Sequence, residues 1–208
     1  TSSVTSVFDI LPASAVALAF KIHPKGGTAG DTSALSSTVV ITDSLGNIVT
    51  DASADIVLAI TPGTGDPSAE LLGTVAVAAV NGVALFDAVR IEKAASGYSL
   101  TAYAFLNDLL PTTLIPISES PPAALQKEVI KEVEVAKEIG VDGAVAISNP
   151  FTIDHAEAAM LVFSTEPGGP EGELGLDVQP VVSILDRYGN NVTSLSPVPI
   201  TLSITPST

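Results

Sequence analysis

The chain has 208 residues, of which 46% are apolar but only 4% aromatic, and it contains neither Cys nor Trp. Its 23 acidic residues against 8 basic ones give a net charge of −15, which disfavours binding to nucleic-acid phosphates and to anionic membrane surfaces. The absence of Cys excludes a disulfide framework and a Cys-based zinc site. The sequence contains no run of 18 consecutive apolar residues, so it predicts no transmembrane helix.

Short strands are predicted along the first 120 residues, because Val, Ile, Leu, Ala and Thr dominate runs that are separated by Gly and Pro turns. The predicted strands cover residues 15–22, 37–42, 55–61, 73–80, 83–90 and 97–105. Six or seven short strands at this spacing are typical of an all-β fold, a β-sandwich of antiparallel sheets.

Asn81-Gly82 is the strongest hairpin signal in the chain, because it stands between VAVAAV and VALF and both residues tolerate positive φ. We therefore expect a tight turn at Asn81 and Gly82 that joins residues 73–80 to residues 83–90 as a hairpin.

Two further turns share one pattern, an Asp followed three residues later by Gly-Asn. The Asp accepts amide hydrogen bonds of the turn and the Gly takes the positive φ. The alternative is a calcium site, with Asp43 or Asp186 as a ligand, but Ca²⁺ requires six to eight oxygens and one Asp in a turn supplies too few. The residues of the two turns are Asp43, Gly46 and Asn47 in DSLGN, and Asp186, Gly189 and Asn190 in DRYGN.

Residues 121–150 differ in composition from their surroundings, because they hold three of the six Lys residues, interleaved with Glu. Apolar residues at 125, 129, 133, 136 and 139 lie on one face of a helix, whereas the EVEV stretch alternates like a strand. We expect a helix over residues 125–139 followed by a strand, with an extended insert as the alternative.

A recurrence relates the two ends of the chain. Residues 8–50 align with residues 151–193 without a gap, and 15 of the 43 aligned positions are identical. Phe151 thus aligns with Phe8, and we call this constant displacement of 143 residues the repeat offset. A long fixed period indicates an array of whole domains rather than a solenoid of small units. We therefore divide the chain into a preceding repeat's tail (1–7), a first repeat (8–120), the insert (121–150) and the first half of a second repeat (151–208).

The half-repeat at 151–208 would leave an apolar face and open strand edges. Two explanations stay open. The sequence is a window of a longer array, or another chain completes the half-domain by strand donation, as in a self-assembling filament subunit.

The pattern of the repeat resembles bacterial immunoglobulin-like (Ig-like) repeats, of the invasin and intimin type, over residues 8–120 and again over residues 151–208, which implies that each repeat is an Ig-like antiparallel β-sandwich. This resemblance implies an extracellular spacer, adhesin or filament component without a catalytic site, and the insert is a departure from it. The residues that carry the resemblance are Leu18, Phe20, Pro24, Asp43, Gly46, Asn47, Val49, Thr50, Leu72, Gly73, Val77, Gly82, Ala84 and Phe86.

No arrangement of residues predicts catalysis. The two histidines, His23 and His155, are not spaced as metal ligands, and Asp154-His155 lacks the nucleophile motif of a hydrolase. There is no dinucleotide, P-loop, zinc-protease or EF-hand pattern. We therefore expect no enzyme activity, no cofactor and no metal.

These observations predict an extracellular or cell-surface structural protein, a stalk, sheath or filament, whose partners are copies of itself or neighbouring repeats. The alternative is a module that binds carbohydrate or a host protein. That alternative is weaker, because sugar-binding faces usually carry exposed Trp or Tyr and the chain has no Trp and only three Tyr, at positions 98, 103 and 188.

Overall fold

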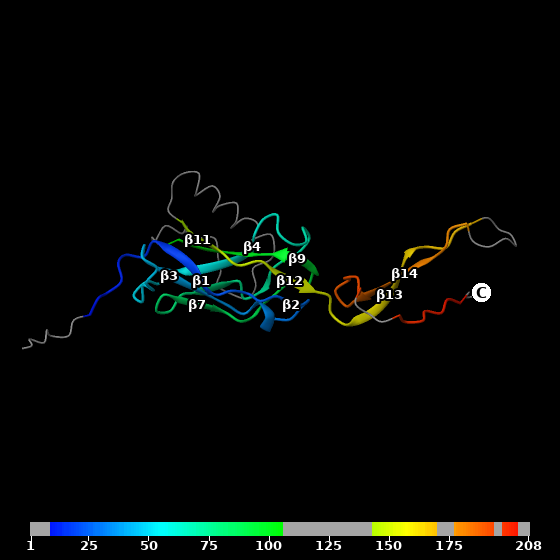
Figure 1. The fold of residues 1–208 in the computed structure, drawn as a ribbon, viewed down its shortest axis with the longest axis horizontal. Coiled ribbons are helices and arrows are strands. Elements are labelled where there is room, and N and C mark those ends of the chain that lie inside the picture. The colour runs from blue at the N-terminus through cyan, green and yellow to red at the C-terminus, as the bar shows by residue number, and fades with distance from the viewer. Residues whose placement is uncertain (1–8, 106–142, 170–176, 194–196, 204–208) are drawn as a thin grey trace, which may run out of the picture. The chain divides into compact units, whose positions relative to one another are not determined.

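A computed structural model describes residues 9–105, 143–169, 177–193 and 197–203, drawn in colour in Figure 1. The chain divides into two compact units, of which the first ends at Asp154 and the second begins at His155. Each unit is considered by itself. None of the residues in the described ranges forms a helix long and apolar enough to cross a membrane.

Two antiparallel sheets form most of the first unit. In one sheet β3 (Ser37–Thr42) lies between β1 (Ala17–Ile22) and β7 (Val83–Phe86). The other sheet has the order β11 (Gly143–Ile147), β10 (Leu100–Phe105), β4 (Asp55–Ile60) and β6 (Ala76–Ala78). β1 lies against β10 and β11 of the second sheet, so the two sheets are neighbours, as Figure 1 shows.

Shorter elements close one end of this unit. β12 (Phe151–Asp154) pairs in parallel with β2 (Gly27–Thr28) and antiparallel with β9 (Ala95–Tyr98). A separate ribbon joins β5 (Leu72–Gly73) to β8 (Val89–Arg90), and a single 3₁₀ turn covers Ser33–Leu35.

The core lies between the central strands of the two sheets. Every residue of β3 is buried, and in β4 the run from Ile56 to Ala59 is buried on both faces. Burying one Leu, Ile or Val side chain stabilises the fold by about 1.5–3 kcal/mol. The continuous apolar runs of these strands are therefore explained by burial on both sides.

The expectation of an all-β fold built from antiparallel sheets is confirmed, and the sheet arrangement is compatible with a β-sandwich. Predicted strands at 37–42 and 55–61 lie within one residue of β3 and β4. The expected strand at 73–80 is instead two short ones, β5 and β6, because Gly73 adopts a φ of +97° and breaks the strand.

The predicted hairpin at Asn81-Gly82 requires a correction. The tight turn is present, with φ of +52° at Asn81 and +71° at Gly82 and a pair of hydrogen bonds between Val80 and Val83. Beyond that pair the strands separate, since β6 joins β4 in one sheet and β7 joins β3 in the other. The Asn-Gly pair specifies the backbone conformation of the turn. The pairing of β7 with β3 depends instead on the burial of Ala84 and Phe86.

Residues 143–154 complete the first unit. β11 extends the sheet of β10, and β12 buries Phe151 and Ile153 between β2 and β9. The second repeat was predicted to begin at residue 151, whereas the second compact unit begins four residues later, at His155. The predicted helix at 125–139 and the tail at 1–7 lie outside the described residues.

The described part of the second unit contains one antiparallel pair, β13 (Ala158–Thr165) and β14 (Val181–Asp186). Its register is that of β1 and β3 displaced by the repeat offset. Leu18 pairs with Ile41 and Leu161 with Ile184, and the ladder shifts after Phe20 in the first pair and after Phe163 in the second.

Candidate functional site: the two Asp-Gly-Asn turns

The turn after β3 is organised by the carboxylate of Asp43. Oδ1 accepts hydrogen bonds from the backbone amides of Leu45 and Asn47, each at 2.9 Å. Oδ2 accepts one from the Asn47 side-chain amide and one from the backbone amide of Ala13, each at 3.0 Å. The last contact ties the segment before β1 to the end of β3.

The turn after β14 repeats this arrangement around Asp186. Oδ1 accepts hydrogen bonds from the amides of Tyr188 (2.8 Å) and Asn190 (2.9 Å). Oδ2 accepts one from the Asn190 side chain and one from the amide of Ala156, both at 2.8 Å. Each donor is the residue that the repeat offset assigns to its counterpart in the first turn.

Gly46 and Gly189 close the two turns. Each donates its amide to the carbonyl of the turn's Asp at 3.1 Å, and φ is +84° at Gly46 and +81° at Gly189. A Cβ at either position would meet no atom within 4 Å. Backbone conformation, rather than lack of space, therefore favours glycine here.

The hydrogen bonds favour the ionised form of both carboxyl groups. The Asn47 side chain, followed by the Ala13 amide, lowers the pKa of Asp43 from 3.8 to about 2 against the opposing effect of burial. Burial by itself would raise the pKa of Asp186, but hydrogen bonds from the Asn190 side chain and the Ala156 amide outweigh it and lower the pKa.

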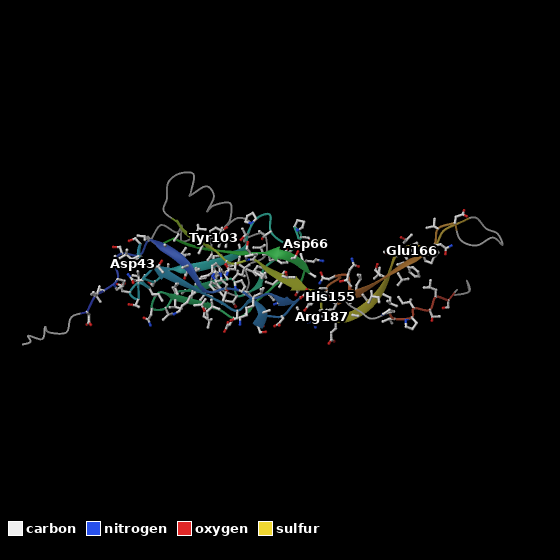
Figure 2. All side chains as sticks on the ribbon, viewed as in Figure 1. Asp43, Asp66, Tyr103, His155, Glu166 and Arg187 are labelled. Carbon is white, nitrogen blue, oxygen red and sulfur yellow. The ribbon has the colours of Figure 1, made fainter. Side chains whose placement is uncertain are left out.

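The geometry favours the structural-turn interpretation over calcium. Both oxygens of each Asp are directed at N–H donors, which a cation would have to displace. No group of three or more acidic residues, His or Cys able to hold a metal occurs among the residues that the structure describes. Figure 2 shows Asp43 and Asp66 at opposite ends of the first unit, so these two carboxylates do not form a common site.

The two histidines have local structural roles. His23 stacks on Phe20 with ring centroids 5.5 Å apart, and its Nδ1 accepts a hydrogen bond from the amide of Asn149 at 3.0 Å. The Nδ1 atom of His155 lies 2.9 Å from the carbonyl oxygen of Ala156. Within the described ranges, neither histidine belongs to a group of side chains that could hold a metal.

Sequence reasoning missed the amides of Ala13 and Ala156, which supply the long-range contact of each turn. A signal was available, because Ala13 and Ala156 are one of the identical pairs related by the repeat offset. The shared alanine did not predict a hydrogen bond, because it contributes only its backbone N–H, which every residue except proline has.

A second structural contact joins the end of β11 to the core of the first unit. The Ser148 hydroxyl accepts a buried hydrogen bond from the Leu100 amide at 2.9 Å, and the Ser148 amide donates to the Leu100 carbonyl at 2.8 Å. Next to it, Phe151 stacks on the fully buried Tyr98 at a centroid distance of 5.9 Å. These contacts fix residues 148–151 to the first unit.

No model of a known protein family matches the chain, no curated protein matches its sequence, and no solved structure matches its fold.

Proposed function

We propose that this chain is part of an extracellular structural protein made of repeated Ig-like units, such as a stalk, sheath or filament. The observation that carries the proposal is that two segments related by the repeat offset have the same local structure. The β1–β3 and β13–β14 pairs share one register, and the turn Asp of each accepts the same four hydrogen bonds. Structural arrays are built in this way, by stacking equivalent units along a chain.

Two further features support a structural role. The side chains that the sequence offers for chemistry, two His and the turn aspartates, are engaged in hydrogen bonds with backbone groups. The net charge of −15 suits a repetitive β-protein that must stay soluble without pairing at strand edges.

The binding-module alternative has less support. Tyr98 and Tyr103 are buried, and the guanidinium of Arg187 lies 4.7 Å from the ring centroid of Tyr188. Two of the three tyrosines are therefore closed to a sugar, and one face of the third ring is occupied by Arg187.

Surface location can be tested with an antibody raised against the purified chain. Intact cells that produce the protein are treated with a protease, and the loss of antibody signal is compared with that of a cytoplasmic marker. We expect the signal to disappear while the marker is retained. Protection of the antigen until the cells are lysed would overturn the proposal.

A further inference from the structure

The polypeptide leaves the first unit through β12, which lies between two other strands, as Figure 1 shows. β12 pairs in parallel with β2, Ile153 opposite Gly27. It pairs antiparallel with β9, Phe151 opposite Tyr98 and Ile153 opposite Ala95. The side chains of Phe151 and Ile153 are only 6% and 2% exposed. β12 is therefore held along both edges and by its buried side chains.

The backbones of β2 and β12 approach each other closely. Gly26, which precedes β2, has a φ of +76°, and a Cβ at this position would collide with the backbone of Thr152. At the end of β12 the carbonyl oxygen of Asp154 accepts a hydrogen bond from the Ala29 amide at 2.8 Å. Backbone contacts therefore hold β12 as far as its last residue.

Very little chain separates β12 from the first anchored residue of the second unit. The Ala156 amide donates a hydrogen bond to Oδ2 of Asp186 at 2.8 Å, so only His155 lies between the anchored residues Asp154 and Ala156. A long flexible linker would extend under tension before it passed force to a unit. With a single intervening residue, tension on the second unit acts directly on the carboxyl end of β12.

We propose that β12 is a mechanical anchor, and that its separation from β2 and β9 is the step that limits unfolding of the first unit under tension. This inference rests on the proposed structural function and names the element that resists tension in a stalk, sheath or filament. Hydrogen bonds between strands run across the strand direction. A pull along β12 therefore strains its bonds to both neighbours together, whereas a strand with one free edge can be peeled away bond by bond.

Single-molecule force spectroscopy on the full chain tests this proposal. The chain contains no Cys, so Asp51→Cys and Glu157→Cys, both at exposed positions, provide specific attachment sites. Asp51 follows Val49, whose amide donates a hydrogen bond to the Ile41 carbonyl in the buried strand β3. A pull between residues 51 and 157 therefore loads β12 from its carboxyl end without loading the residues before β1.

Two buried isoleucines give a matched pair of variants in this background. Ile153 lies in β12 and Ile56 in β4, and their side chains are 2% and 0% exposed. Ile153→Ala and Ile56→Ala should both lower stability in urea, because each leaves a cavity. A substitution speeds forced unfolding only where its contacts are broken at the rate-limiting step. We therefore expect Ile153→Ala to lower the rupture force and Ile56→Ala to leave it unchanged.

If either alanine variant fails to fold, Ile153→Val and Ile56→Val give the same comparison with a smaller loss of stability. A rupture force that Ile153 substitution leaves unchanged would overturn the inference, as would an equal fall in both variants. So would a separate low-force event in which β12 comes away while the rest of the unit stays folded. The pulling experiment uses purified chain, so its outcome is independent of the protease test on intact cells.

Discussion

Asp43 and Asp186, equivalent residues under the repeat offset, accept the same four hydrogen bonds from donors at the same relative positions. Two are backbone amides within the turn, one is the side chain of the Asn four residues on, and one is the amide of an alanine 30 residues earlier. The last donor makes each Asp a link between two segments as well as the first residue of a turn.

Acid should therefore weaken the fold. The folded pKa of Asp43, about 2, lies below its ordinary value of 3.8, and that of Asp186 is also lowered. A carboxyl group with a depressed folded pKa contributes stability above its unfolded pKa and loses that contribution as pH falls through the folded pKa. We expect the free energy of unfolding, measured in urea, to fall between pH 4 and pH 2.

Asp43→Asn isolates the contribution of one carboxylate to this pH dependence. The variant should be less stable than the wild type at pH 7, and the difference between them should shrink as pH approaches 2. Asp51→Asn, at an exposed position, is the matched control and should follow the wild type throughout. A constant difference between Asp43→Asn and the wild type at all pH values would argue against the ionised turn.

Two buried serines should respond oppositely to loss of their hydroxyl. Ser148→Ala leaves the buried Leu100 amide without its acceptor, which costs about 1–3 kcal/mol. The Ser37 hydroxyl is fully buried and has no hydrogen-bond partner among the described residues, so Ser37→Ala should be neutral or stabilising. Thermal unfolding of both variants measures this, and an equal loss in both would contradict it.

Substitution of two glycines with positive φ, Gly63 and Gly73, distinguishes the cost of backbone strain from the cost of a steric clash. A Cβ at Gly63, where φ is +76°, would meet nothing within 4 Å, and Gly63→Ala should cost about 1–2 kcal/mol from the left-handed backbone alone. At Gly73, where φ is +97°, a Cβ would lie 1.8 Å from the carbonyl oxygen of Ala88.

Gly73→Ala should therefore cost at least about 3 kcal/mol, because the β5–β8 ribbon must shift to remove the clash. Chemical denaturation of the two variants gives the comparison. Equal destabilisation would show that space at residue 73 is not limiting.

Leu18 and Leu161 test the difference between the two strand pairs. Leu18→Ala removes a buried side chain and should cost about 2–5 kcal/mol. Leu161→Ala removes an exposed one and should change the stability of the isolated chain by less than about 0.5 kcal/mol. A large loss from Leu161→Ala in a monomeric chain would mean that the β13–β14 surface is already covered.

The local features could be predicted from the sequence because they depend on neighbouring residues. Continuous apolar and β-branched runs bounded by turn residues located β3 and β4, and the Asp, Gly and Asn of each turn specified its backbone. The Asn81-Gly82 turn was also predictable, since it depends only on the φ preferences of two residues.

Long-range pairing was not predictable, because it depends on which faces become buried together. β6 and β7 follow one another around a tight turn, yet they belong to different sheets. β12 lies at the start of the segment 151–193 that aligns with residues 8–50, and it still buries Phe151 and Ile153 in the first unit. The hydrogen bond from the Ala13 amide to Asp43 could not be predicted for a related reason, because a backbone amide donor does not depend on the residue type.

The recurrence of structure can be measured most directly by NMR titration of the Asp43 and Asp186 carboxyl carbons in the full chain. We expect both to titrate below 3.8, Asp43 at about 2. Asn47→Ala should raise the pKa of Asp43 alone, and Asn190→Ala that of Asp186 alone. An ordinary pKa at either Asp, or no response to loss of its own Asn, would contradict the equivalence of the two turns.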